Sequence, residues 1–282
     1  MSTGPAPTVS VCIPTYMGAS YIAQALDSVL DQSFTDFEIV VSDDASTDAT
    51  LQILSGYDDP RLRVLPNSVN AGASANWNRA LAAARGRYVK LLCHDDYLYP
   101  GALERQVAGF GEPGSGGVVL VTSPRDIVDD DGTRLMTRGL DVPGRMCGDD
   151  VRRRIVRSGT NVLGETSSAL FRTDAARAAG GFDTSSFYTL DVEFWMRLLQ
   201  EGDLFVVGET LSAYRVHLAS WSVALASGQA ADFAAMVRRF AAEEDSGISR
   251  SDVAVGAAMA RINAIGRRVV YSLMRRGVLG GS

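Results

Sequence analysis

The 282-residue sequence lacks the short motifs that mark several large enzyme classes. No G-x-G-x-x-G fingerprint follows the first predicted strand and no G-x-x-x-x-G-K-[ST] loop occurs, so neither a dinucleotide-dependent oxidoreductase nor a P-loop nucleotidase is supported. The chain also has no G-x-S-x-G, no H-E-x-x-H and no cysteine-rich zinc pattern, which excludes the common hydrolases and metalloproteases. A ligand that carries phosphate groups therefore has to be held by another device.

Cysteine and positive charge are also scarce. The three cysteines, Cys12, Cys93 and Cys147, form no C-x-x-C pair, and two of them lie in apolar runs, so a reducing, cytoplasmic setting is expected. The net charge of -6 and the pI near 5.0 disfavour nucleic acid as a partner, because binding its phosphates requires clustered Lys and Arg. The N-terminal residues resemble no signal peptide, and no apolar run approaches the ~18 residues of a membrane span. We therefore expect a soluble protein.

Strand and helix signals alternate in the first part of the chain. Strands are predicted at Val9 to Ile13, Phe37 to Val41, Leu62 to Leu65 and Tyr88 to Cys93. Helices are predicted between them, at Ile22 to Leu30 behind a Ser20 cap, at Ser46 to Tyr57 and at Ser74 to Arg85. This alternation indicates an α/β fold with a mostly parallel sheet, in which ligands bind at the carboxyl ends of the strands.

The periodicity is weaker after residue 111, where the sheet is expected to become mixed. A strand is predicted at Val118 to Thr122, and Asp130-Asp131-Gly132 predicts a tight turn. Further predicted elements are a helix around Val151 to Arg157, a strand at Ser167 to Phe171 and an amphipathic helix at Leu190 to Gln200. Residues 223–276 are expected to form two helices separated by Asp245 to Ser251.

Two acidic pairs are the most informative feature of the sequence. Asp43-Asp44 follows the second predicted strand, and Asp95-Asp96 follows the fourth. Because both strands are apolar runs of one sheet, four carboxylates are delivered to one edge, where isolated charges would be costly to desolvate. A hard divalent cation held by aspartate oxygens is the simplest device that would bind a diphosphate there.

At this point the sequence resembles a known family. The blocks P-T-Y (Pro14 to Tyr16), D-D-A-S-T-D (Asp43 to Asp48), N-A-G-A-S-A-N-W-N (Asn70 to Asn78) and G-R-Y-V-K-L-L-C-H-D-D (Gly86 to Asp96) look like those of family 2 glycosyltransferases of the GT-A fold. G-G-F-D, L-D-V-E-F-W-M-R-L and Y-R-V-H extend the resemblance to about residue 222. It implies a GT-A domain at 1–222, with a nucleotide-binding half at 1–110 and an acceptor-binding half at 111–222, followed by a helical extension at 223–282.

The resemblance also implies roles for individual residues. The nucleotide would be held by Pro14, Thr15, Tyr16, Asp43, Asp44, Asn70 and Asp95, which lie in the matching blocks. Asp96 and His217 would form the site of a Mn or Mg ion: Asp96 corresponds to the metal ligand, and His217 corresponds to a histidine that closes over the diphosphate. Asp191 corresponds to the catalytic base of an inverting transfer. Two residues depart from the commonest pattern, Cys93 in place of Asp and Trp77 in place of Arg, and they indicate a subgroup.

Each assignment has a structural alternative. Asp43-Asp44 and Asp191 could serve only as helix N-caps, and Asp95-Asp96 could form a solvated turn. The helix dipole at Leu190 is expected to keep Asp191 ionised. His217 could be an ordinary surface histidine. On the acceptor side the sequence offers Glu165, in NVLGET, and Trp221, which could either stack on a sugar or pack.

The last predicted helix has apolar residues at helical spacing, with Arg261, Arg268 and Arg275 at seven-residue intervals. Packing or homodimer formation is one interpretation, and peripheral attachment to the inner face of a membrane is the other.

Together these observations favour a soluble, metal-dependent glycosyltransferase. Its partners would be a nucleotide-diphosphate sugar, UDP-linked or dTDP-linked, and a glycan, lipid-linked or small-molecule acceptor. A catalytically silent nucleotide-sugar binding module is an alternative, although it would not need Asp191. A sugar nucleotidyltransferase would need a basic loop after the first strand, and PTYMGASY contains neither Lys nor Arg.

Overall fold

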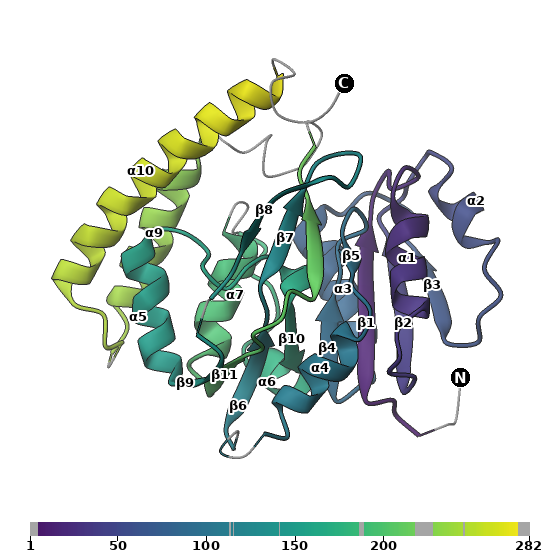
Figure 1. The fold of residues 1–282 in the computed structure, drawn as a ribbon, viewed down its shortest axis with the longest axis horizontal. Helices are drawn as coiled ribbons and strands as arrows, with labels where there is room; N and C mark the ends of the chain where they lie inside the picture. The colour runs from purple at the N-terminus through teal and green to yellow at the C-terminus, as the bar shows by residue number, and fades with distance from the viewer. Residues whose placement is uncertain are drawn as a thin grey trace.

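The computed structural model describes residues 5–112, 114, 116–140, 142–185, 189–217, 228–244 and 246–275. Within these ranges a mixed sheet of eight strands, in the order β3-β2-β1-β4-β10-β6-β11-β9, forms the centre of the molecule (Figure 1). A second sheet of four strands, β5-β12-β7-β8, stands beside it. Helices cover both faces of the large sheet, so the predicted α/β fold is confirmed.

The N-terminal half alternates strand and helix as the sequence predicts. Its elements are β1 (Val9–Thr15), α1 (Ile22–Leu30), β2 (Phe37–Asp43), α2 (Thr50–Leu54), β3 (Leu62–Pro66), α3 (Ala73–Ala83) and β4 (Tyr88–Leu91). The four strands pair in parallel, and every residue of β1, β2 and β4 is buried. Apolar strands buried on both faces are typical of a parallel sheet covered by helices on each side.

Two local predictions in this half are wrong. Helix α2 begins at Thr50 and not at Ser46, because the chain passes through a left-handed residue at Ala45, with φ of 62°, and Asp48 accepts the hydrogen bond from the backbone N of Thr50. Ser20 does not cap α1: the cap position is Tyr21, and no side-chain hydrogen bond is made there.

The sheet becomes mixed in the second half, as predicted. Its elements are β5 (Tyr97–Leu98), α4 (Ala102–Gly109), β6 (Val118–Thr122), β7 (Arg125–Val128), β8 (Arg134–Arg138), β9 (Gly144–Met146), α5 (Gly148–Ser158), the 3-10 turn η1 (Thr166–Ser168), β10 (Ala169–Arg172), α6 (Thr173–Ala178), α7 (Leu190–Leu198), β11 (Asp203–Val206), β12 (Ser212–Arg215), α9 (Gln229–Ala241) and α10 (Arg250–Arg275). Strand β10 runs antiparallel to both of its neighbours, β4 and β6. The predicted tight turn at Asp130 to Gly132 joins β7 to β8, and Gly132 has φ of 83°.

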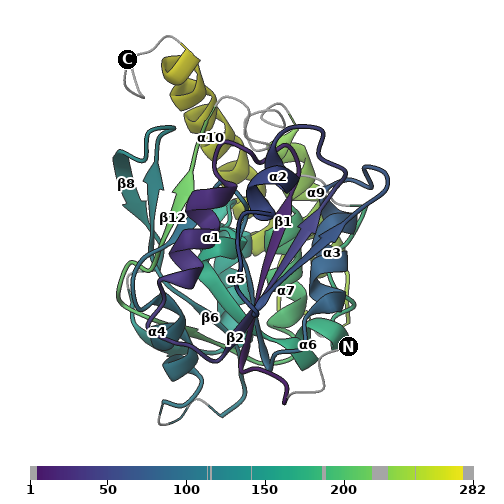
Figure 2. The same ribbon diagram turned by 90° about the vertical axis from the view of Figure 1, so that its right-hand side faces the viewer.

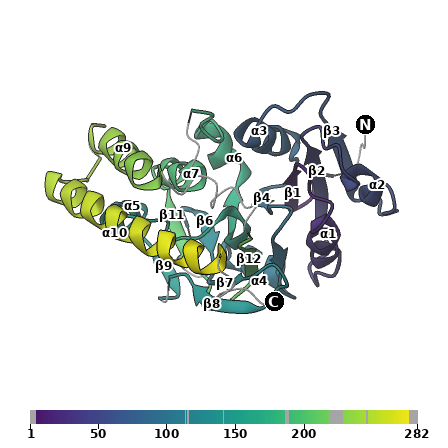
Figure 3. The same ribbon diagram turned by 90° about the horizontal axis from the view of Figure 1, so that it is seen from above.

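Two apolar clusters lie on opposite faces of the large sheet. One is formed by α1, α4 and the odd-numbered residues of β1, such as Val11, and the other by α3, α5, α7 and the C-terminal helices. Seen from above, α5, α9 and α10 gather at one end of the molecule and α1, α2 and α3 at the other (Figure 3). No helix among the described residues is long and apolar enough to cross a membrane.

Candidate active site

The first acidic pair lies at the edge where β1 and β2 end. Thr15 and Asp43 are opposite each other in the register, and both are buried. Oδ2 of Asp43 accepts a hydrogen bond of 3.0 Å from the backbone N of Ser46, whereas its Oδ1 and Oγ1 of Thr15 have no partner among the described residues. Because buried oxygens without a partner are costly, this edge is suited to a ligand that donates hydrogen bonds.

Asp44 holds the loop that leads into α3. Its Oδ1 accepts hydrogen bonds from Nδ2 of Asn67 (2.7 Å) and from the backbone N of Ala71 (2.9 Å), and its Oδ2 accepts one from the backbone N of Gly72 (2.9 Å). Asn70, exposed in the same loop, also accepts a hydrogen bond of 3.1 Å from Gly72. Neither Asp43 nor Asp44 caps a helix, since α2 begins at Thr50, and the N-cap interpretation of this pair is therefore wrong.

The remaining predicted residues of this edge differ in exposure. Pro14 is buried within β1, whereas the side chain of Tyr16, directly after the strand, is 49% exposed. The structure thus gathers the predicted nucleotide-binding residues of the first two blocks around the adjacent ends of β1 and β2, some as buried polar groups and one as an exposed ring.

The second acidic pair follows β4 and forms a compact cluster with Cys93. One ligand atom from each of Cys93, Asp95 and Asp96 lies within 4.8 Å of the others. Asp96 is 1% exposed, its Oδ1 accepts a hydrogen bond of 3.0 Å from the backbone N of Arg215, and its Oδ2 accepts one from the hydroxyl of Ser167. Asp95 lies with Oδ2 3.3 Å from Nε2 of His217, so the histidine borders the cluster through Asp95.

The electrostatics of this cluster fit a divalent cation. Burial, reinforced by the neighbouring charge of Asp95, raises the pKa of Asp96 well above its usual value. Burial acts most strongly on Asp95 and would raise its pKa, but the hydrogen bond from His217 and the charges of His94 and His217 together outweigh burial and lower the pKa of that carboxyl. A bound cation would relieve the repulsion between the two carboxylates, and hard cations such as Mg²⁺ and Mn²⁺ prefer their oxygens.

Two residues next to this cluster, Arg215 and Lys90, were not among the site residues predicted from the sequence. The buried guanidinium of Arg215 donates hydrogen bonds to the backbone O of Asp95 and of Asp129, each of 3.0 Å, and lies over the ring of Tyr21. Behind the cluster, the buried Lys90 donates a hydrogen bond of 2.9 Å to Gln106, and burial lowers its pKa to about 7 against the opposing attraction of Asp96. Arg215 lies inside the Y-R-V-H block, which was the only sequence signal for it.

Asp191 lies in the first turn of α7, as predicted. Its Oδ2 accepts a hydrogen bond of 2.8 Å from Nδ2 of Asn161, and its Oδ1 accepts one of 2.7 Å from the backbone N of Val192. Burial, with the charge of Glu165 added to it, raises the pKa of Asp191 to about 7. The expectation that the helix dipole keeps this carboxyl ionised is therefore wrong, because desolvation outweighs the dipole.

Glu165 connects the two acidic groups electrostatically. Its charge raises the pKa of both Asp96 and Asp191, while its own carboxylate forms an ion pair of 2.7 Å with Nε of Arg125. The charge of Asp191 in turn contributes to raising the pKa of Cys93, which belongs to the Asp95-Asp96 cluster. The structure thus brings Glu165 and Asp191 close to the Asp95-Asp96 cluster. Trp221, the other acceptor-side residue expected from the sequence, lies outside the described residues.

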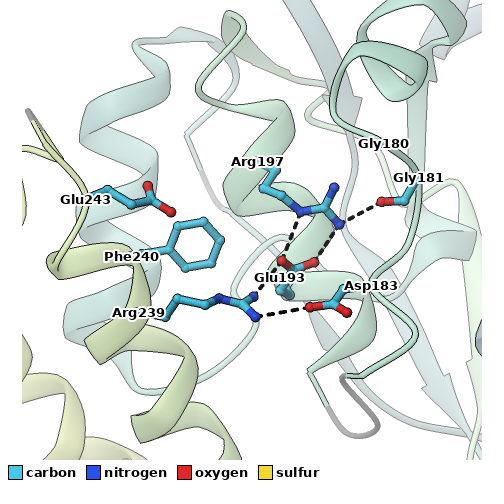
Figure 4. Close-up of a pocket in the computed structure, with 8 residues that line it drawn as sticks. All are labelled: Gly180, Gly181, Asp183, Glu193, Arg197, Arg239, Phe240 and Glu243. Carbon is cyan, nitrogen blue, oxygen red and sulfur yellow. Dashed lines mark hydrogen bonds and ion pairs between the residues drawn. The ribbon is translucent and has the colours of Figure 1, made fainter.

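A cavity of about 340 Å³ lies elsewhere, between α7, α9 and the Gly180-Gly181 turn (Figure 4). Glu193 projects toward it and accepts hydrogen bonds from Arg197 (2.6 Å) and Arg239 (2.6 Å). Glu193 is two residues after Asp191, so it lies on the opposite side of α7. Its carboxylate is already bound by two arginines, and this cavity is separate from the acidic site.

Comparisons with known proteins agree with this geometry. Residues 10–177 match the model of Glycosyl transferase family 2. The chain belongs to this family. It is 35% identical over 224 residues to an uncharacterized protein of Mycobacterium tuberculosis, covering 76% of this chain and 69% of that protein. The putative teichuronic acid biosynthesis glycosyltransferase TuaG of Bacillus subtilis is 43% identical over 103 residues, which cover 36% of this chain and 41% of that protein.

Solved structures show the same fold. The S. aureus TarS fragment 1-349, determined in complex with UDP-GlcNAc, superposes with a TM-score of 0.66 at 23% identity, covering 82% of this chain and 65% of that chain. The mannosyltransferase PcManGT of Pyrobaculum calidifontis, determined with GDP-Man and Mn2+, gives a TM-score of 0.65 at 17% identity and covers 99% of this chain and 77% of that chain. The chain therefore combines membership of a glycosyltransferase family with the GT-A fold.

Proposed function

We propose that the protein transfers a sugar from a nucleotide diphosphate to an acceptor hydroxyl, with inversion at the anomeric carbon and with the help of a divalent ion. A UDP-linked donor is favoured over a dTDP-linked one, since the TarS structure was determined with UDP-GlcNAc. The observation that carries the proposal is the position of Asp191, a partly buried carboxyl with a pKa of about 7 beside the acidic cluster of Asp95 and Asp96.

In this proposal the two strand ends hold the donor. Thr15 and Asp43 offer buried oxygens without a partner to the nucleoside, and Asp44 fixes the Asn70 loop beside them. Asp95 approaches the ribose, and Asp96 holds the Mn or Mg ion together with the diphosphate. Such an ion neutralises the charge that develops on the departing diphosphate. His217 orients the carboxylate of Asp95, which it contacts, and closes over the diphosphate.

Asp191 would activate the acceptor. An alcohol is a weak nucleophile until a carboxylate within hydrogen-bond reach takes its proton, and a base is most effective when its pKa is near the working pH. Asn161 and the backbone of Val192 fix the direction of the Asp191 carboxylate. A single base on the acceptor side supports direct displacement and therefore inversion. Glu165 and Trp221 stay candidates for contacts with the acceptor.

The same proposal assigns the parts of the chain. Residues 1–110 would bind the nucleotide and residues 111–222 the acceptor, with 223–282 as a helical extension. The alternative of a silent binding module is disfavoured by Asp191, whose partly buried carboxyl would carry a desolvation cost without a purpose. A nucleotidyltransferase is disfavoured because the loop after β1 contains neither Lys nor Arg.

A thermal-shift screen tests the proposal directly. UDP, dTDP and GDP should be compared, each with and without MnCl2, because a ligand that binds only the folded state raises the melting temperature. A shift with UDP or dTDP that requires manganese is the expected result. The same samples, supplied with UDP-sugars, should release UDP slowly by hydrolysis. Absence of any nucleotide-dependent shift would contradict the proposal.

A further inference from the structure

The outer face of helix α10 carries an apolar stripe. Val255, Ile262, Ile265 and Val269 are 39%, 59%, 62% and 55% exposed. Their spacing of seven, three and four residues places them along one side of the helix. Four branched apolar side chains in one exposed row are unusual on a protein surface, where such residues are normally scattered singly.

The opposite side of α10 packs against the rest of the molecule. Gly256 is buried against the backbone O of Val156 in α5, and Nδ2 of Asn263 donates a hydrogen bond of 2.9 Å to the backbone O of Ser158. Ala260 and Ala264 are buried, and Arg267 donates a hydrogen bond of 2.5 Å to Gln229 of α9. Since the packing face is filled in this way, the apolar stripe is not needed to hold α10 on α5 and α9.

Arginines lie on both borders of the stripe. Arg261 and Arg268 are exposed, and each directly precedes a residue of the stripe, Ile262 or Val269. Because an α-helix turns by about 100° per residue, both arginines lie along the same border of the stripe. On the other border, Arg153 and Arg157 of α5 are 54% and 48% exposed and reach Asp252 of α10.

The composition of the helix has the same bias. Residues 250–275 contain five arginines and a single acidic residue, Asp252, which is buried, although the whole chain has a net charge of -6. An apolar stripe bordered by cations is the pattern of helices that lie in the interface of an anionic bilayer, where the apolar side chains enter the headgroup region and the arginines contact lipid phosphates.

We infer that α10 docks the protein on an anionic lipid surface. Charge decides between this partner and a second copy of the chain. In a pair of α10 helices the stripes would bring Arg261 and Arg268 of one copy toward the equivalent arginines of the other, and α10 offers no exposed acidic residue to balance them. A bilayer rich in anionic lipid provides both an apolar layer and the opposite charge.

The position of α10 gives this docking a direction. Its C-terminal end rises on the side of the molecule on which β1 and β12 end, in two perpendicular views (Figures 1 and 2). Asp43 and Asp96 lie near those strand ends, so the C-terminal end of α10 is on the same side of the molecule as the acidic site. This inference does not require the proposed transfer reaction, since it depends only on the face of α10.

Co-sedimentation with vesicles tests the inference. The full chain should pellet with vesicles of phosphatidylcholine and phosphatidylglycerol, should not pellet with phosphatidylcholine alone, and should be released as salt screens the charges. The double variant Ile262→Ser/Ile265→Ser should bind the anionic vesicles at least about tenfold more weakly, since two apolar side chains no longer enter the interface. Arg261→Gln/Arg268→Gln should lose the preference for anionic lipid.

Controls separate this result from misfolding and from self-association. Leu51→Ser changes an exposed apolar residue of α2, at the other end of the molecule, and should bind vesicles like the parent. All variants should keep the parent's melting temperature and its nucleotide-dependent thermal shift. Failure of the parent to bind anionic vesicles, or equal binding by Ile262→Ser/Ile265→Ser, would overturn the inference. So would light scattering that shows a dimer in the parent and a monomer in that variant, because the stripe would then be covered by a second copy.

Discussion

Asn161 donates a hydrogen bond of 2.8 Å to Oδ2 of Asp191, and its own Oδ1 accepts hydrogen bonds of 3.1 Å from the backbone N of Leu163 and of Gly164. The amide is thus fixed by its own loop and in turn fixes the carboxylate at the start of α7. A base whose direction is set before the acceptor arrives loses little entropy on binding it.

Asp191→Asn should leave donor binding intact and abolish most transfer. The amide keeps the size of the side chain but cannot take a proton, so the rate should fall by a factor on the order of a hundred or more. Single-turnover transfer to any acceptor, together with calorimetric UDP affinity, measures the two effects separately. Asp174→Asn, which changes an exposed carboxylate on α6, is the matched control. A variant that transfers at the parent's rate would remove Asp191 as the base.

The pH dependence of transfer should show the titration of Asp191. Its pKa is raised to about 7 by burial and by Glu165, so the ionised fraction increases as pH rises through neutrality. We expect kcat/KM to increase with pH up to about 7 and to level off above it. Folding favours the protonated form of this carboxyl because its pKa is higher in the folded protein than in the unfolded chain. The stability that the group contributes at low pH is therefore lost as the pH rises through about 7. Asp191→Asn should therefore melt no lower than the parent at pH 8, and its residual activity should lack the acid limb.

Asp96→Asn should imitate removal of the metal. With one carboxylate of the cluster neutralised, calorimetry should show UDP binding that no longer differs between manganese and EDTA buffers. The parent should bind UDP substantially more tightly with manganese. The matched control is Asp131→Asn in the exposed β7–β8 turn, which should retain the manganese dependence. Equal affinities of the parent in the two buffers would exclude a role for the ion in donor binding.

His217→Ala should weaken donor binding or slow transfer without unfolding the protein. The ring lies 5.2 Å from that of Tyr21 and its Nε2 is 3.3 Å from Asp95, so its loss changes the rim of the site and leaves both apolar clusters untouched. The melting temperature and the turnover of the UDP-sugar should be compared with those of the parent. Unchanged turnover would make His217 an ordinary partly buried histidine.

Asp252→Asn should destabilise the C-terminal helices. Its carboxylate is fully buried and accepts hydrogen bonds from Arg153, Arg157 and Ser249, which outweigh the cost of burial and hold its pKa well below the usual value. The arginines are about half exposed, so we expect a loss of about 1–3 kcal/mol in the free energy of unfolding at pH 7.

The sign of the pH effect follows from the lowered pKa of Asp252. Stability from this group is present above the unfolded-state pKa of 3.8 and is lost as the pH falls below it. Urea denaturation at pH 7 and at pH 3 should therefore show a smaller difference between parent and variant at the lower pH. Asp150→Asn, on an exposed residue of α5, is the control. A difference that grows on acidification would contradict the assignment.

The sequence was sufficient for the architecture because its signals are local. Apolar runs such as Val9 to Ile13 are buried strands, and the two acidic pairs lie at strand ends as the parallel sheet requires. The start of α2 could not be predicted, since it depends on the left-handed Ala45 and on Asp48. The contact of Ser167 with Asp96 joins residues 71 positions apart, and the burial that raises the pKa of Asp191 comes from tertiary packing. Neither the contact nor the burial can be predicted from the periodicity of the sequence.

Arg215 spans the site with backbone and side chain together. Its N–H binds Asp96, and its guanidinium binds carbonyl oxygens on two other loops, including that of Asp95. The end of β12 is thereby tied to the main chain, and it cannot slide along its axis without breaking the bond to Asp96. The direction in which the chain leaves β12 toward His217 is consequently set by the same carboxylate that is proposed to hold the metal. A change in the position of the Asp96 carboxylate on binding the metal would therefore also move the segment that follows Arg215, although Asp96 and Arg215 are 119 residues apart in the sequence.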